Sequence, residues 1–140
     1  MDNLYRDFIL EHYRAPHNKG VLEPHDLHFA DSNPTCGDEL SMTIQLEDDK
    51  ERVRDVAFDG RGCAISQASA SIFTDELRGL TLSELNLLDS ARVVKNLGVP
   101  IGPARLKCAL LIYKVLQGSL TGKAASWPEE ATLIADSSSP

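Results

Sequence analysis

A segment of strict alternation between apolar and polar side chains constrains the fold of this chain more than any other feature of its sequence. Residues 40–47 alternate throughout, and this period of two predicts a β-strand that is buried on one face. The apolar positions are Leu40, Met42, Ile44 and Leu46. Residues 48–50 indicate a turn, and a second strand is expected over residues 53–59, so the two strands would form an antiparallel hairpin.

Helical periodicity accounts for most of the other apolar residues. We expect helices over residues 3–13, 64–78, 81–97 and 104–118. The third begins at a capping box, Thr81 to Glu84, and carries apolar positions as far as Leu97. Gly118 is expected to end the last helix.

The order of these segments predicts an α+β fold built on a small antiparallel sheet. The 140 residues suggest a single domain, which we expect over residues 1–125. Residues 126–140 end in a polar, serine-rich sequence and are expected to form a flexible tail. Residues 21–38, which include Pro24 and Pro34, are expected to be irregular.

Three cysteines and one aspartate are the candidate functional residues. Cys36 and Asp38 lie two positions apart. Cys63 is expected to open a helix, and Cys108 lies near the start of the last helix. Because each stands where an element begins or ends, the four side chains can converge at one rim of a sheet. Three thiolates and a carboxylate would make a tetrahedral site for zinc or iron.

The residues alone leave other interpretations open. A cysteine is often a small core residue, and the spacing of these three matches no CxxC zinc motif. Lys107, beside Cys108, would stabilise a thiolate or a bound persulfide anion, or would be an ordinary exposed lysine of a helix. His12 and His17 are not needed as ligands and are expected to attach the first helix or to form a partner surface.

Charge, hydropathy and cysteine count exclude several functional classes. The net charge of −7 disfavours binding to nucleic acid, which requires a basic surface. No apolar run approaches the roughly 20 residues needed to cross a membrane, and the acidic N-terminus does not resemble a signal peptide. An odd number of cysteines argues against a disulfide framework, so we expect a reducing cytoplasm.

Four segments in this order resemble the iron–sulfur cluster assembly scaffolds of the IscU/NifU N-terminal type. They are HYRAPHNKG, PTCGDEL, GRGCAISQASAS and PARLKCALL, and the resemblance extends over residues 4–120. It implies a sheet of three strands with helices packed on one face, and hence a further strand within residues 26–33.

Within that family, the last segment resembles the SufU branch. IscU scaffolds carry a histidine before the last cysteine and a chaperone-recognition segment before that, whereas this chain has Lys107 and IGPARLK. The resemblance implies zinc held by Cys36, Asp38, Cys63 and Cys108, and sulfur delivered by a SufS-like cysteine desulfurase. The span from Cys63 to Cys108 is instead similar in length to that of IscU, because SufU proteins carry an insertion there.

Three hypotheses follow from the sequence. In the first, Cys108 accepts persulfide sulfur as a thiolate maintained by zinc, and Asp38 is a weaker oxygen ligand that can detach. In the second, the same ligands hold a labile [2Fe–2S] cluster or iron and pass it to acceptor proteins. In the third, zinc is needed only for folding.

Overall fold

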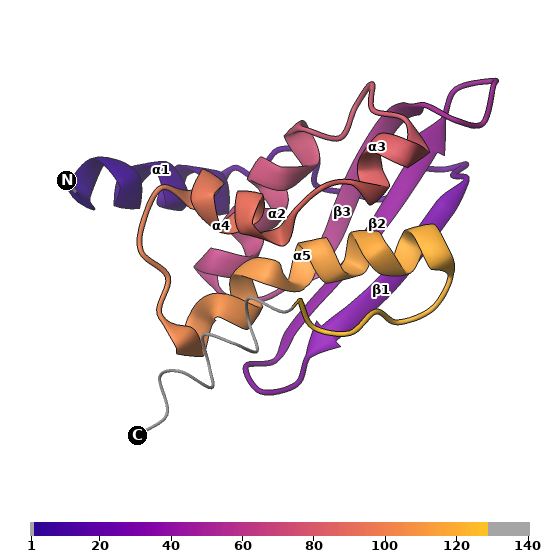
Figure 1. The fold of residues 1–140 in the computed structure, drawn as a ribbon. Helices are drawn as coiled ribbons and strands as arrows, with labels where there is room; N and C mark the ends of the chain where they lie inside the picture. The colour runs from indigo at the N-terminus through magenta and orange to yellow at the C-terminus, as the bar shows by residue number, and fades with distance from the viewer. Residues whose placement is uncertain (1, 129–140) are drawn as a thin grey trace.

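A three-stranded antiparallel sheet forms one layer of the computed structural model, which describes residues 2–128. The strands β1 (Leu27–Asn33), β2 (Asp38–Leu46) and β3 (Val53–Arg61) lie side by side in chain order (Figure 1). The predicted hairpin is therefore confirmed. The expectation of irregular structure over residues 21–38 was wrong for β1, where the third strand implied by the family resemblance is found.

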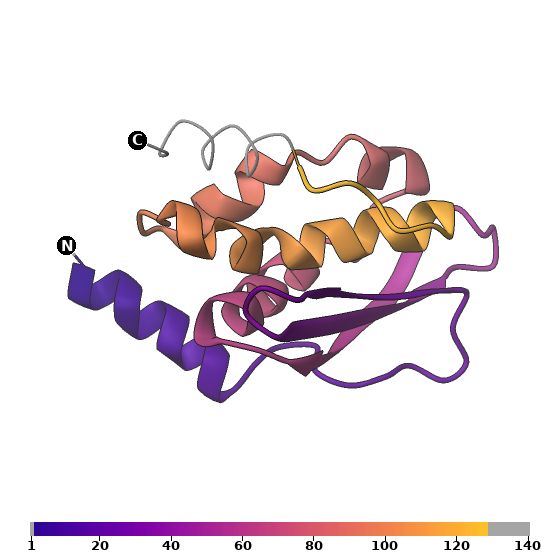
Figure 2. The same cartoon turned by 90° about the horizontal axis from the view of Figure 1, so that it is seen from below.

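Helices cover one face of the sheet, as predicted (Figure 2). They are α1 (Asp2–Arg14), α2 (Ala64–Asp75), α3 (Leu82–Asn86), α4 (Ser90–Leu97) and α5 (Pro103–Thr121). The longest, α5, packs on β1 and β2, whereas α1 lies beside α2 at the end of the molecule. No helix in the described part of the chain is long and apolar enough to cross a bilayer.

The single helix expected over residues 81–97 was wrong, because two short helices occupy this stretch. The Thr81 capping box starts α3 as predicted, but the Asp89 carboxylate accepts a hydrogen bond from the Ala91 N–H and starts α4 as a separate helix. Between them residues 87–89 are not helical, which separates α3 from α4.

Gly118 does not end the last helix. The helix α5 continues to Thr121 and ends at Gly122, whose φ of 78° is the left-handed conformation typical of a helix end. Gly118 instead lies where α5 touches the sheet, because a Cβ atom there would be 2.3 Å from Cδ2 of Phe29. A small residue is needed at this point for close packing, and sequence periodicity does not reveal that need.

The strand pairing gathers three chain segments at one end of the sheet. Asn33 at the end of β1 pairs with Asp38 at the start of β2, and Glu39 pairs with Arg61 at the end of β3. The β1–β2 loop and the junction of β3 with α2 therefore lie together, close to the first turns of α5 (Figure 1). The predicted convergence of element ends occurs here.

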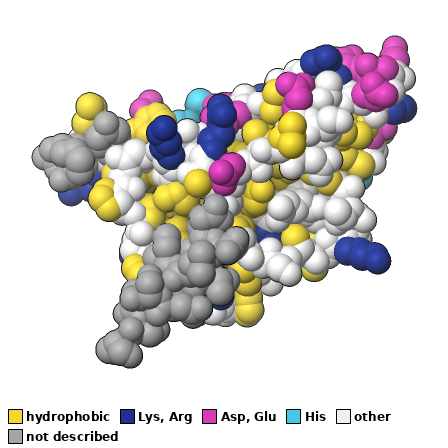
Figure 3. Space-filling model, viewed as in Figure 1, with side chains coloured by type: hydrophobic (Ala, Val, Ile, Leu, Met, Phe, Trp, Pro, Cys, Tyr) yellow, Lys and Arg dark blue, Asp and Glu magenta, His cyan; other side chains and the backbone are white. Residues whose placement is uncertain are grey.

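Most of the predicted tail lies outside the described residues, which end at Pro128, so the boundary at residue 125 stays a prediction. On the described part of the face drawn in Figure 3, Lys and Arg side chains lie in separate places, whereas most of the acidic side chains gather at the upper right.

Candidate metal centre

Three of the four predicted ligands are brought together. The ligand atoms of Cys36, Asp38 and Cys108 all lie within 4.8 Å of one another. Cys36 Sγ is 3.2 Å from Cys108 Sγ and 3.0 Å from Asp38 Oδ2. Cys63 borders the group, since its Sγ is 3.9 Å from Asp38 Oδ2, but it does not lie within 4.8 Å of all three other ligand atoms.

The local backbone explains why these side chains meet. Gly37 adopts a φ of 76°, which lets the chain turn between Cys36 and the first residue of β2. Cys63 precedes α2, and its N–H donates to Asp38 Oδ1 at 2.9 Å. Cys108 reaches the same place from the second turn of α5.

Gly62 leaves the space that the Asp38 carboxylate occupies. A Cβ atom at this position would lie 2.4 Å from Asp38 Oδ1 and 2.4 Å from the hydroxyl oxygen of Ser66. Ser66 is buried and donates to the Cys63 carbonyl at 3.1 Å. Gly62 thus lets the carboxylate approach the start of α2.

The Asp38 carboxylate is buried without a cationic side chain. It is 1% exposed, and no Lys, Arg or His among the described residues forms an ion pair with it. Its neighbours are one backbone N–H and thiols. Burying an unpaired carboxylate costs several kcal/mol, by order of magnitude, so this donor set fits a metal cation.

The surroundings oppose ionisation of two thiols. Burial raises the pKa of Cys108 well above its usual value, and the neighbouring Cys36 and Asp38 raise it further. Burial also raises the pKa of Cys36, with Asp38 adding to the effect. Without a cation these two side chains would be neutral thiols at neutral pH, which are poor nucleophiles.

Access and reactivity are distributed unevenly over the three cysteines. Cys36 is exposed, Cys63 is half-buried and Cys108 is buried. A reagent that approaches the centre from solvent therefore meets Cys36 first.

Lys107 does not point at the centre. Its Nζ lies 5.2 Å from the centroid of the Trp127 ring, where the cation interacts with the aromatic face. Lys114, two turns further along the same face of α5, lies at the same distance from this ring and pairs with Asp31 of β1. A role for Lys107 at a sulfur atom would require it to leave Trp127.

His12 attaches α1 to the body of the protein. Its Nδ1 lies 2.7 Å from the hydroxyl oxygen of Ser71 in α2, and His17 Nδ1 lies 2.6 Å from Asp75 Oδ2. Both histidines belong to this junction and not to the cysteine group.

Sequence reasoning missed Asn33, which contacts the centre. Its side-chain Nδ2 donates to Cys36 Sγ at 3.0 Å, and it is 3% exposed. The signal was present in the order Asn-Pro-Thr-Cys, because an asparagine before a turn commonly bonds to the residues that follow.

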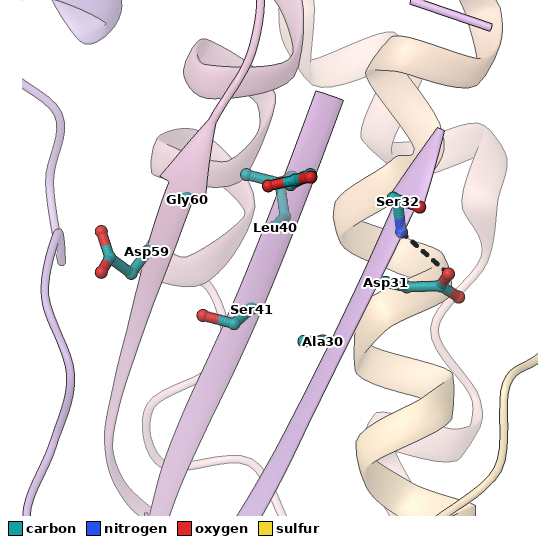
Figure 4. Close-up of a pocket in the computed structure, with 8 residues that line it drawn as sticks. Ala30, Asp31, Ser32, Leu40, Ser41, Asp59 and Gly60 are labelled. Carbon is teal, nitrogen blue, oxygen red and sulfur yellow. Dashed lines mark hydrogen bonds between the residues drawn. The ribbon is translucent and has the colours of Figure 1, made fainter. Parts of the chain in front are cut away.

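A separate hollow lies on the sheet, lined in part by Asp31, Ser41, Asp59 and Gly60 (Figure 4). Its two aspartates do not converge, because Asp31 pairs with Lys114 while Asp59 lies 3.8 Å from Lys19. This hollow therefore lacks the free ligands that the cysteine group has.

Comparison with known proteins gives a consistent picture. The family model of the NifU-like N-terminal domain matches residues 4–123 of this chain. The zinc-dependent sulfurtransferase SufU of Bacillus subtilis (strain 168) is 38% identical over 135 residues, covering 84% of this chain and 89% of SufU. The iron–sulfur cluster assembly scaffold protein IscU of Streptococcus pyogenes serotype M1 is 32% identical, covering 86% of this chain and 84% of its own.

Solved structures share the fold. The crystal structure of FiSufU, a candidate iron–sulfur cluster assembly scaffold of the SUF system from Fervidobacterium islandicum AW-1, superposes with a TM-score of 0.69 at 27% identity. The match covers 81% of this chain and 94% of that one.

Proposed function

The chain belongs to the NifU-like N-terminal domain family of iron–sulfur cluster assembly scaffolds, and we propose that it accepts persulfide sulfur at a zinc centre. The zinc ligands would be Cys36, Asp38, Cys63 and Cys108. The donor would be a SufS-like cysteine desulfurase in the cytoplasm, and the sulfur would pass to downstream iron–sulfur assembly or acceptor proteins.

The observation that carries this proposal is the buried, unpaired carboxylate of Asp38 among cysteine sulfurs. Zinc binds thiolates readily and also accepts a carboxylate oxygen. The 38% identity to a zinc-dependent sulfurtransferase supports zinc as the metal.

The proposed transfer exchanges one S–S bond for another. The Cys108 thiolate attacks the terminal sulfur of the desulfurase persulfide, and a new S–S bond forms on Cys108. The S–S bond of the donor breaks, and its electron pair leaves with the desulfurase cysteine as a thiolate. Oxidation states balance, so no external oxidant or reductant is needed.

A bound cation would supply the thiolate that this reaction needs. The raised thiol pKa values leave Cys36 and Cys108 protonated in the metal-free protein, whereas a coordinated thiol is deprotonated. Lys107 would contribute by contacting the anionic persulfide after leaving Trp127.

Native mass spectrometry after anaerobic incubation with a SufS-like desulfurase and cysteine tests the proposal. We expect retained zinc and added sulfur that maps to Cys108, and no added sulfur in Cys108→Ala. The variant Lys95→Ala, which alters an exposed lysine of α4, is a matched control and should take up sulfur normally.

Two outcomes would contradict the proposal. Normal sulfur uptake by Cys108→Ala would exclude Cys108 as the acceptor. Retained zinc with no added sulfur, at high desulfurase activity, would favour the scaffold hypothesis. That hypothesis predicts an intense visible absorption after anaerobic reconstitution, from a labile [2Fe–2S] cluster that can be transferred to an apo-ferredoxin.

A further inference from the structure

The chain beyond α5 turns back onto the helical layer of the molecule. Gly122 ends α5 in the left-handed conformation, with a φ of 78°, and the coil that follows returns along this helix (Figure 2). Trp127 then lies against two lysines of α5 and packs on the main core, and Pro128 is buried. Both residues lie beyond residue 123, where the match to the family model ends. Their contacts therefore belong to this chain's own C-terminal extension.

The last described residue lies beside the most exposed leucine in the described part of the chain. Pro128 lines a hollow together with Leu87 and Leu88, and the two leucines also line a second hollow with Leu80. The Leu87 side chain is 83% exposed. A single exposed leucine is ordinary, but one that borders two hollows leaves room for an apolar segment to pack around it. We call this area, formed by Leu80, Leu87 and Leu88, the Leu87 surface.

The chain itself carries an apolar segment within reach of this surface. Leu133 and Ile134 are the only large apolar residues after Pro128, and the sequence then ends in Asp-Ser-Ser-Ser-Pro. Leu133 follows Pro128 by five residues, which span at most about 17 Å when extended, so it can pass Leu87 from the hollow that Pro128 shares. Because the segment is tethered there, its effective concentration is on the order of millimolar, and a small apolar contact is sufficient.

Apolar contact, and not ion pairing, would hold the segment. Arg92 is the single basic residue that lines either hollow, and it already pairs with Glu76 at 2.9 Å. The other charged residues there, Glu84 and Asp89, are acidic. They would not attract the two glutamates that follow Pro128, so the apolar residues beyond them are the part of the extension that fits.

We propose that residues 131–134 fold back onto the Leu87 surface of the same molecule, with Leu133 and Ile134 packed around Leu87. The extension then covers an apolar surface of the helical layer, which a second copy or a partner protein could bind only after the extension had left. This inference does not depend on the metal centre, so its failure would leave the proposed function untouched.

Backbone ¹⁵N relaxation of the full-length protein tests the proposal. We expect order parameters above about 0.6 for residues 131–134 of the wild type, and nuclear Overhauser contacts between methyl groups of Leu133 and Leu87. In Leu87→Ala, which removes most of an exposed side chain, the order parameters should fall below about 0.6. The far-ultraviolet circular dichroism spectrum should not change.

Matched variants locate the contact on both sides. Leu4→Ala truncates another leucine, which is 76% exposed on α1, and should leave residues 131–134 ordered. Leu133→Asp should release the segment, because it places a charge in the apolar contact. Ser138→Asp adds the same charge near the end of the chain and should leave the segment docked.

Three outcomes would overturn the inference. Low order parameters for residues 131–134 in the wild type would identify the flexible tail expected from the sequence. Loss of order in Leu4→Ala, with order retained in Leu87→Ala, would place the segment on another surface. A wild-type dimer in sedimentation velocity that dissociates in Leu87→Ala would assign the Leu87 surface to a second copy of the chain.

Discussion

Gly62 makes room for the Asp38 carboxylate because it has no Cβ atom. A Cβ atom at this position would overlap both Asp38 Oδ1 and the Ser66 hydroxyl. A centre that combines soft sulfur ligands with one oxygen is sensitive to the placement of that oxygen.

Gly62→Ala should therefore weaken zinc binding. Displacement of Asp38 should lower the affinity by about 10-fold to 100-fold, the range typical of changes beside a ligand. Competition with a chromogenic chelator measures this. Gly102→Ala is the matched control, because a Cβ atom at Gly102 meets nothing within 4 Å, and its affinity should equal that of wild type. Equal affinities of both variants would show that Asp38 tolerates the displacement.

The candidate site residues could be predicted from the sequence where metal-binding chemistry allows only a few residue types. They could not be predicted where their role depends on which side chains the fold brings together. Cys36, Asp38 and Cys108, singled out because few side chains bind a soft metal, lie together in the structure, whereas Cys63 lies at the edge of the group. The direction of Lys107 was not predictable, because its partner Trp127 lies far away in the sequence. Asn33 was missed since asparagine before a turn has an ordinary structural explanation.

At the scale of elements, the contact between α5 and β1 depends on Gly118. A Cβ atom there would lie 2.3–2.8 Å from three carbons of the Phe29 ring, including Cγ near its base. We expect Gly118→Ala to destabilise the protein by about 1–3 kcal/mol, because overpacking outweighs the gain in helix propensity. Urea unfolding of the metal-free protein measures this free energy.

A compensating change gives this prediction its control. Phe29→Leu shortens the opposing side chain, so the double variant should recover part of the stability that Gly118→Ala loses. Strictly additive losses in the two variants would show that the ring and the new methyl group do not collide.

The junction of α1 with α2 is sensitive to pH through His12. Burial lowers the pKa of His12 below 6.5, and the neighbouring His17 lowers it further. The unfolded chain therefore binds this proton more tightly than the folded protein does. The stabilising contribution of neutral His12 is present above pH 6.5 and is lost as pH falls below 6.5 toward the folded pKa.

The free energy of unfolding of chelator-treated protein should accordingly fall between about pH 7 and about pH 5. His12→Asn removes the titration and keeps an acceptor near Ser71, so its slope over this range should be smaller. His28→Asn, an exposed site on β1, should retain the wild-type slope. Identical slopes in all three proteins would place the pH dependence elsewhere.

Helices and strands were predicted well where the apolar periodicity is strong, and poorly where the conformation depends on pairing or packing with another element. The alternation over residues 40–47 predicted β2 to within two residues at each end. The strand β1 carries few apolar residues and owes its conformation to pairing with β2. Gly118 was misjudged because its contact with Phe29 joins positions that are distant in the sequence. The break before α4 was missed for another reason: Asp89 is a local cap for the Ala91 N–H, and the apolar periodicity over residues 81–97 was given more weight.

At the scale of the molecule, the main apolar core does not include the candidate ligands. That core joins the sheet to α5 and the neighbouring helices, whereas Cys63 and Cys108 belong to a smaller cluster near α1. The fold should therefore persist without metal, in contrast to a protein whose zinc is required for folding.

Removal of zinc should leave the far-ultraviolet circular dichroism spectrum unchanged and lower the melting temperature. A metal present at a thousandfold excess over its Kd stabilises by about 4 kcal/mol, which corresponds to a shift on the order of 10 °C. Thermal melts with and without chelator check this. Loss of the helical signal on chelation at room temperature would instead favour the purely structural role for zinc.

The packing of Lys107 on Trp127 gives this protein an optical reporter. Trp127 is the single tryptophan of the chain, so its fluorescence arises from one place, against a lysine adjacent in sequence to Cys108. If an anionic persulfide on Cys108 draws the ammonium group away, the emission of the ring should change as sulfur arrives. Stopped-flow fluorescence would then follow each transfer in real time, without a label, and Lys107→Met would silence the signal while Trp127 remained.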